Sequence, residues 1–224
     1  MNRATGYGRG FGPAGVVMAL LLVAAPVFAK RPAAAAPATP AADKQEVVKA
    51  ELNATVALAG IKVSRLALVE EASLADLKEA IGAMYDRKEE ATKDALTKLH
   101  DANGDKAKVS EAVAALSAAD AETAKYFRKN PEVKDKIAKR AAVINTEIGQ
   151  IVRTPDGYVA KLKKAGLAGD ALDKAKSLVK DASKKAGGKT DADSTDAVLS
   201  ARKDIRESMS AAQVKALDAA LGGT

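Results

Sequence analysis

The chain has 224 residues, a formal net charge of +7 and neither cysteine nor tryptophan. Aromatic residues make up only 3% of it, whereas hydrophobic residues make up 47%, many of them alanine. This composition excludes disulfides, thiolate metal sites and thiol enzymes, and it suits closely packed helices better than a β-sandwich. We therefore predict an all-α fold of antiparallel helical hairpins, a bundle of about six to seven helices.

The N-terminus has the pattern of a bacterial secretory signal peptide. Arg3 and Arg9 precede an apolar run, residues 14–25, that is too short for a comfortable membrane span. Val27 and Ala29 supply the small residues of a cleavage site, so we predict cleavage after Ala29 and a periplasmic or secreted protein. The alternative is an uncleaved leader that anchors the chain in the membrane.

A proline- and alanine-rich segment follows the leader. Residues 30–42 (KRPAAAAPATPAA) favour an extended conformation and cannot join a packed core. The predicted organisation is therefore a signal peptide (1–29), a linker (30–42) and one all-helical domain (43–224).

The rest of the chain shows apolar residues at helical spacing, interrupted by glycine, proline and Asn-Gly signals. Ser73 and Asp76 resemble a capping box at the start of the second helix, and Thr190 with Asp193 offers another N-terminal cap. The first two helices are expected to form an antiparallel hairpin. The predicted helical segments are 43–72, 73–100, 106–129, 133–152, 158–165, 170–186, 190–208 and 211–221.

The segment 133–152 is predicted to be the central helix. Its apolar residues recur at steps of three and four, so they form one stripe that must be buried against other helices. Asn130 is a candidate N-cap ahead of Pro131, and Pro155 ends the run. Arg140 and Glu147 are expected to lie mostly off the stripe. The stripe consists of Val133, Ile137, Ala141, Ile144, Ile148, Ile151 and Val152.

The chain has few residues that could carry catalysis. Its single histidine, His100, lies beside Asp101 at a predicted helix end, where the helix dipole favours a cation. A Ser/His/Asp site needs a histidine oriented by a carboxylate, and no Gly-rich phosphate loop of the G-x-x-x-x-G-K-[ST] type occurs. We predict a non-enzymatic protein without catalytic residues, cofactor or bound metal.

The loop 101–105 (DANGD) resembles the start of an EF-hand calcium loop. The resemblance ends at Lys106, where the loop needs glycine, and at Ala112, where it needs a bidentate glutamate. A plain Asn-Gly turn accounts for the sequence. An enzyme or a calcium sensor stays open as a third hypothesis on function.

Lysines are concentrated in residues 159–189, which hold nine of them against three aspartates, whereas residues 43–98 are close to balanced. Such a segment forms either an ordinary solvated face or a surface that attracts acidic proteins, lipid headgroups or envelope polyanions. Scarce arginine and the single nearby aromatic residue, Tyr158, argue against nucleic acid. The candidate client- or anion-binding residues are Lys161, Lys163, Lys164, Lys174 and Lys176.

A last motif, Met209-Ser210-x-x-Gln213, has the form of a capping box, and Leu116-Ser117-x-x-Asp120 echoes it inside a predicted helix. The motif resembles the repeated Leu-Thr-x-x-Gln of the Spy/CpxP family of small exported helical proteins. The resemblance implies an ATP-independent periplasmic chaperone or envelope-stress binding protein whose partners are unfolded or acidic proteins. We expect Met209, Ser210 and Gln213 themselves to have a structural role.

The alternative is a structural cell-envelope protein. In that case the linker would hold a helical bundle near the membrane or the wall. The heptad-like run 74–99 would then mediate a coiled-coil assembly such as a homodimer.

Overall fold

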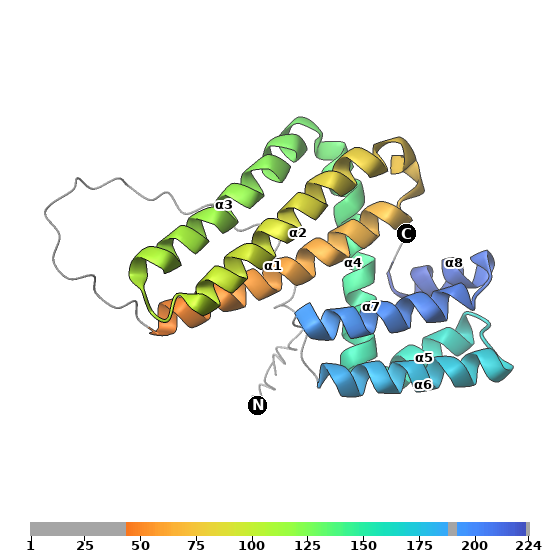
Figure 1. The fold of residues 1–224 in the computed structure, drawn as a ribbon. Coiled ribbons are helices and arrows are strands. Elements are labelled where there is room, and N and C mark those ends of the chain that lie inside the picture. The colour runs from red at the N-terminus through yellow and green to blue at the C-terminus, as the bar shows by residue number, and fades with distance from the viewer. Residues whose placement is uncertain (1–43, 188–191, 223–224) are drawn as a thin grey trace, which may run out of the picture. The chain divides into compact units, whose positions relative to one another are not determined.

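The structure, a computed structural model, describes residues 44–187 and 192–222 (Figure 1). Within these ranges it contains eight α-helices, one 3₁₀ helix and no strand, which confirms the all-α prediction, and the number of α-helices exceeds the expected six to seven. The predicted leader, the linker and the cap at Thr190 lie outside the described residues. The helices are α1 (Lys44–Glu70), η2 (Ala72–Leu77), α2 (Lys78–Asp101), α3 (Lys106–Lys129), α4 (Pro131–Arg153), α5 (Pro155–Lys164), α6 (Gly169–Ala186), α7 (Ala192–Glu207) and α8 (Ala211–Ala220).

The helix α4 is the centre of the domain. Helices α1, α2 and α3 lie side by side on one part of it, and α5 to α8 gather around its other end (Figure 1). In the described residues α4 contacts α1, α3, α5, α6 and α7. All seven residues of the predicted stripe are buried, and Ile144 and Ile151 are fully so. The prediction of a central buried helix is confirmed.

The start of α4 differs in detail from the prediction. Pro131 occupies the first turn as expected, and Asn130 stands at the N-cap position. The Asn130 side chain makes no capping hydrogen bond to α4, however, because its Nδ2 donates to the carbonyl of Tyr126 at 3.0 Å. Asn130 therefore closes the end of α3 and does not cap the start of α4.

The capping box predicted at Ser73 is absent. Glu71 is the cap, and its Oε1 accepts from the Ser73 backbone N–H at 3.2 Å and from the Ser73 hydroxyl at 2.6 Å. The Ser73 hydroxyl is thus used as a donor and does not cap a helix. The 3₁₀ helix η2 occupies residues 72–77, and α2 begins only at Lys78. Lys78 Nζ then donates to the Val69 carbonyl at 2.5 Å and ties this corner to the end of α1.

The buried residues form two separate clusters. The larger one joins the second half of α1, the first half of α2 and helices α4 to α8. The smaller one lies where α1 begins, α2 ends and α3 begins, and more than half of it is alanine. Small side chains let the three helices approach closely but bury little apolar area. The small cluster consists of Ala50, Ala54, Leu99, Ala102, Val109 and Ala112.

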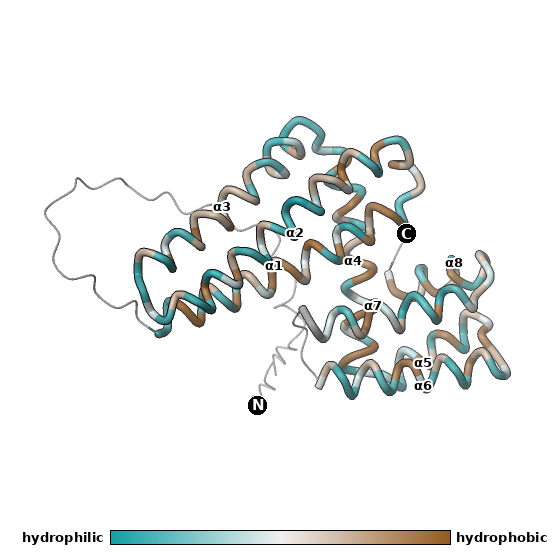
Figure 2. Tube along the Cα trace, in the orientation of Figure 1, coloured by the Kyte–Doolittle hydropathy of each residue, from teal (hydrophilic) through white to brown (hydrophobic). Residues whose placement is uncertain are grey.

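The helix α1 is rich in hydrophobic residues (Figure 2), and some of their side chains are exposed in the half that holds the small cluster. Val48 and Leu52 are 61% and 60% exposed and lie one helical turn apart. Among the described residues, α1 alone is long and apolar enough to cross a membrane, yet it packs against α2 and α4 and its apolar window is 33% buried. The second half of α1 thus belongs to the main core, whereas its first half exposes apolar side chains to solvent.

Replacing Ile144 with alanine tests the central position of α4. The side chain is fully buried, so Ile144→Ala is expected to lower the free energy of unfolding by about 3 kcal/mol through lost burial and a cavity. Urea denaturation followed by circular dichroism measures this. The adjacent exposed Asn145→Ala should change stability by less than about 0.5 kcal/mol. Equal effects at the two positions would contradict a buried stripe.

Candidate functional site

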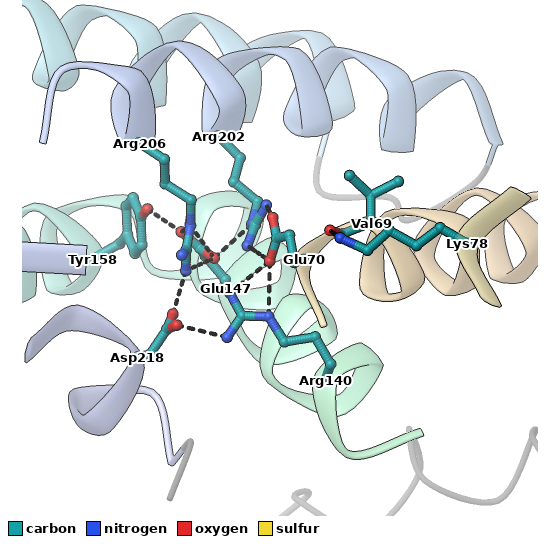
Figure 3. Close-up of polar contacts among 9 residues, drawn as sticks. All are labelled: Val69, Glu70, Lys78, Arg140, Glu147, Tyr158, Arg202, Arg206 and Asp218. Atoms are coloured by element: carbon teal, nitrogen blue, oxygen red, sulfur yellow. Dashed lines mark hydrogen bonds and ion pairs between the residues drawn. The ribbon is translucent and has the colours of Figure 1, made fainter. Parts of the chain in front are cut away.

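A network of arginines and carboxylates lies inside the main core (Figure 3). Its centre is Glu147 of α4, which has no exposed surface. Arg202 of α7 donates through Nε to Glu147 Oε2 at 2.6 Å, and Arg206, one turn further on, donates through Nη2 to the same oxygen at 2.7 Å. The Tyr158 hydroxyl of α5 donates to Glu147 Oε1 at 2.5 Å. One carboxylate therefore joins three helices.

A second carboxylate, Glu70, ends α1 and connects it to the same network. Arg140 of α4 donates to Glu70 Oε2 through Nε at 2.8 Å and through Nη2 at 2.5 Å. Arg202 forms a fork with Glu70, in which Nη1 contacts Oε1 and Nη2 contacts Oε2 at 2.9 Å. Paired contacts of this kind are the strongest that arginine makes with a carboxylate.

The third carboxylate is Asp218 of α8. Its Oδ2 accepts from Arg140 Nη1 at 2.6 Å and its Oδ1 accepts from Arg206 Nη2 at 2.6 Å. The network thus contains three guanidinium groups and three carboxylates, supplied by α1, α4, α7 and α8. This balance makes the burial of Glu147 and Arg202, and the partial burial of the other four charged groups, tolerable, because an unpaired buried charge costs several kcal/mol.

The network lowers the pKa of two carboxyl groups, Glu70 and Asp218, and raises the pKa of the Tyr158 phenol. Burial alone would raise the pKa of Glu70, but hydrogen bonds and charge from Arg202 and Arg140 hold it below 4.5. Burial would likewise raise the pKa of Asp218, and the bonds from Arg206 and Arg140 hold it below 3.8. Burial and the neighbouring Glu147 raise the pKa of the Tyr158 phenol, so this group remains a hydrogen-bond donor at neutral pH.

This arrangement suits positioning better than proton transfer. The carboxylates are bound by guanidinium groups, which do not give up protons. In the part of the chain that the structure describes, no three His, Asp or Glu side chains lie close enough together to hold a metal ion. We interpret the network as a set of contacts that fixes how α1, α4, α7 and α8 meet.

The expectation that Arg140 and Glu147 lie mostly off the buried stripe is wrong. Glu147 is completely buried, and the Arg140 side chain is only 17% exposed. The sequence does contain a pattern that indicates their shared position. Arg140 and Glu147 are two helical turns apart, so they share a face of α4, and both lie at the edge of the isoleucine stripe. The same applies to Arg202 and Arg206, which are one turn apart on α7.

The five candidate lysines lie on α5 and α6 but do not all have the same environment. Lys161 is partly buried, and its Nζ donates to the Ala220 carbonyl of α8 at 2.8 Å. Lys176 pairs with Asp173, one turn before it on α6, at 2.7 Å. Lys163, Lys164 and Lys174 are exposed and make no ion pair with any described residue. We call these last three the lysine surface.

The capping motif is present at the start of α8. Ser210 Oγ accepts from the Gln213 backbone N–H at 3.3 Å, and Gln213 Oε1 accepts from the Ser210 N–H at 2.9 Å. Met209 packs against the main core. The sequence did not reveal that Gln213 Nε2 also donates to the Gly166 carbonyl at 2.7 Å, which attaches α8 to the connection between α5 and α6. The echo at Ser117 lies within α3, where its hydroxyl donates back to Val113.

The loop 101–105 forms a tight turn between α2 and α3. Asn103 and Gly104 both have positive φ, 48° and 82°, as an Asn-Gly turn requires. Asp105 caps α3, because its Oδ1 accepts from Ala107 N–H at 2.9 Å. That carboxylate is thus occupied by the helix start, and His100 beside the loop is exposed.

Comparison with known proteins found no match among family models, curated proteins or solved structures.

Glu147→Gln tests the role of the network centre. The change keeps the shape of the side chain but leaves Arg202 and Arg206 without one negative charge, so we expect a loss of about 3 kcal/mol in the free energy of unfolding. Urea denaturation measures it. Glu90→Gln on the exposed surface of α2 is the matched control and should be near neutral. A near-neutral Glu147→Gln would show that the network contributes little.

The lowered pKa values predict acid sensitivity. A carboxyl group with a depressed folded-state pKa contributes stability above its unfolded pKa and loses it as the pH falls through the folded value. The unfolding free energy should therefore fall as the pH drops from about 5 towards 3. Asp218→Asn should be less stable than the original chain at pH 7, and the difference should narrow at low pH. A difference independent of pH would contradict the assignment.

Proposed function

We propose that this chain is a non-enzymatic exported binding protein with a chaperone-like action, which captures acidic or partly unfolded proteins without ATP. The observation that carries the proposal is the lysine surface: Lys163, Lys164 and Lys174 are exposed and unpaired within the described residues. Free lysines attract anionic partners over distances set by the salt concentration. The resemblance to the Spy/CpxP family and the predicted periplasmic location support the same proposal.

We further propose that capture has two steps, an electrostatic encounter followed by apolar contact, and the second step also has candidate residues. Val48, Leu52 and Val113 are exposed, and they lie on α1 and α3, whereas the lysine surface lies on α5 and α6. Capture would accordingly use two different surfaces: a basic one for the first encounter and an apolar one for weaker subsequent contact. Envelope polyanions are an alternative partner for the basic surface alone.

The competing proposal, a structural coiled-coil protein, has less support. Its heptad-like run supplies Ile81, Met84, Ala95 and Leu99, and these side chains are buried against neighbouring helices of the same chain. A coiled coil between copies would need them to be released from these cores. If analytical ultracentrifugation shows a defined dimer and the helix packing within each copy is unchanged, the copies must associate through a face other than the heptad-like run.

The test is an aggregation assay with the original chain and a chemically unfolded acidic client at low salt. We expect the protein to suppress aggregation, with less effect on a basic client and at high salt because salt screens the lysines. Lys163, Lys164 and Lys174 are replaced together by glutamate, and this variant should lose most of the suppression. Lys161 is left unchanged because it supports α8.

The matched control replaces Lys106, Lys108 and Lys125 of α3 by glutamate, which alters the net charge equally at exposed positions. It should retain suppression. No suppression by the original chain at several-fold molar excess would refute the proposal, and equal loss in both variants would show that only the net charge matters.

A further inference from the structure

The position of Asp218 has the features of an occupied anion site. Two guanidinium groups, from Arg140 of α4 and Arg206 of α7, each donate to a different oxygen of the same carboxylate at 2.6 Å (Figure 3). The Asp218 side chain is 18% exposed, whereas Glu147 and Arg202 are at most 2% exposed. Asp218 therefore stands at the outer edge of the network, where solvent reaches it.

The two arginines are held in place without any help from α8. Arg140 is bound by Glu70 of α1 through two nitrogens, at 2.8 and 2.5 Å. Arg206 is bound by Glu147 of α4, most closely at 2.7 Å. Their remaining N–H groups would accordingly keep their direction if Asp218 were withdrawn. Donors oriented in advance bind an anion at a lower entropic cost.

Charge balance favours a replacement anion. Without Asp218, three arginines would face only Glu70 and Glu147, which leaves one positive charge in a largely buried setting. That charge is expensive unless water or an anion compensates it. A carboxylate or phosphate oxygen pair matches the geometry that Asp218 now supplies.

The helix α8 is a separable cover for this site. It follows α7 near the C-terminal end of the described chain, and only Leu217 and Leu221 bury large apolar side chains at its end of the core. Besides the ion pairs of Asp218, it packs against α5 and makes two hydrogen bonds outside its own helix, from Gln213 to Gly166 and from Lys161 to Ala220. Withdrawal of α8 would leave the contacts among α1, α4 and α7 in place.

We propose that Arg140 and Arg206 form an oxyanion-binding site that the chain's own Asp218 occupies, and that α8 is a displaceable cover of this site. The site binds the carboxylate or phosphate group of a ligand in exchange for Asp218. It is distinct from the lysine surface and does not depend on the function proposed above.

Anion rescue of a full-length Asp218→Ala variant tests the site. Removal of the carboxylate should lower the melting temperature, and sodium formate should restore it with a saturable dependence on concentration. For a dissociation constant of about 10 mM, 0.1 M formate would raise the folding equilibrium constant about tenfold. Sodium chloride at equal ionic strength separates binding from screening. Phosphate is the second probe, and the stronger of the two anions identifies whether the ligand is a carboxylate or a phosphoryl group.

Two controls make the rescue specific. Asp173→Ala removes an exposed α6 carboxylate and the same charge, and formate should not stabilise it beyond the chloride effect. The double variant Asp218→Ala/Arg206→Gln lacks one of the two donors and should lose at least most of the rescue. If formate raises the melting temperature of Asp218→Ala no more than chloride does, the proposal is overturned.

Native-state hydrogen exchange of the unaltered protein tests the cover and is decisive if Asp218→Ala does not fold. Amides of α8 should exchange at least tenfold faster than those of the fully buried residues of α4, and 0.1 M phosphate should accelerate α8 selectively. Exchange of α8 only through global unfolding, at the same rate as α4, would show that the cover does not open and would overturn the proposal.

Discussion

The burial of charge in the main core constrains the rest of the structure. Glu147 has no contact with solvent, so its two oxygens need donors from neighbouring helices, which are Arg202, Arg206 and Tyr158. Those arginines then need further carboxylates, which come from the end of α1 and from α8. Helices that could slide along an apolar interface without much cost are thereby held in one register, since any shift would separate buried charges. Such a network is better suited to specifying one arrangement than to adding stability.

Three arginines of the network are used differently from the lysines of α5 and α6, whereas Arg65 and Arg87 pair with acids on the surface. Arginine, whose planar group binds two carboxylates at once, occupies the interior at Arg140, Arg202 and Arg206. Lysine, which is more strongly hydrated, provides the exposed charge of α5 and α6. The protein can therefore be basic on its surface while its interior remains neutral. This separation is what makes a binding role for the exterior compatible with a stable core.

Packing by small side chains has a second consequence. The cluster at the start of α1 is built largely of alanine, so α1, α2 and α3 lie close together but leave Val48 and Leu52 outside. Further along α1, Ile61, Val63, Ala67 and Leu68 are buried in the main core, to which α4 also belongs, although Val69 is exposed. One helix thus serves both the core and a surface suited to weak apolar contact.

The periodic placement of aliphatic residues by itself determined the helical segments, the all-α fold and the central position of α4, because a stripe of isoleucine can be satisfied only by burial. The sequence determined the caps only in part. Ser210 and Gln213 form the expected box, whereas Ser73 and Asn130 donate to other groups, since several acceptors compete for one short polar side chain. Only the tertiary structure decided that Glu70, Glu147 and Asp218 meet three arginines, because those residues come from four helices and their spacing within any one helix does not identify the partners. It also decided which lysines are free, because the Ala220 carbonyl that binds Lys161 is brought to it by the packing of α8.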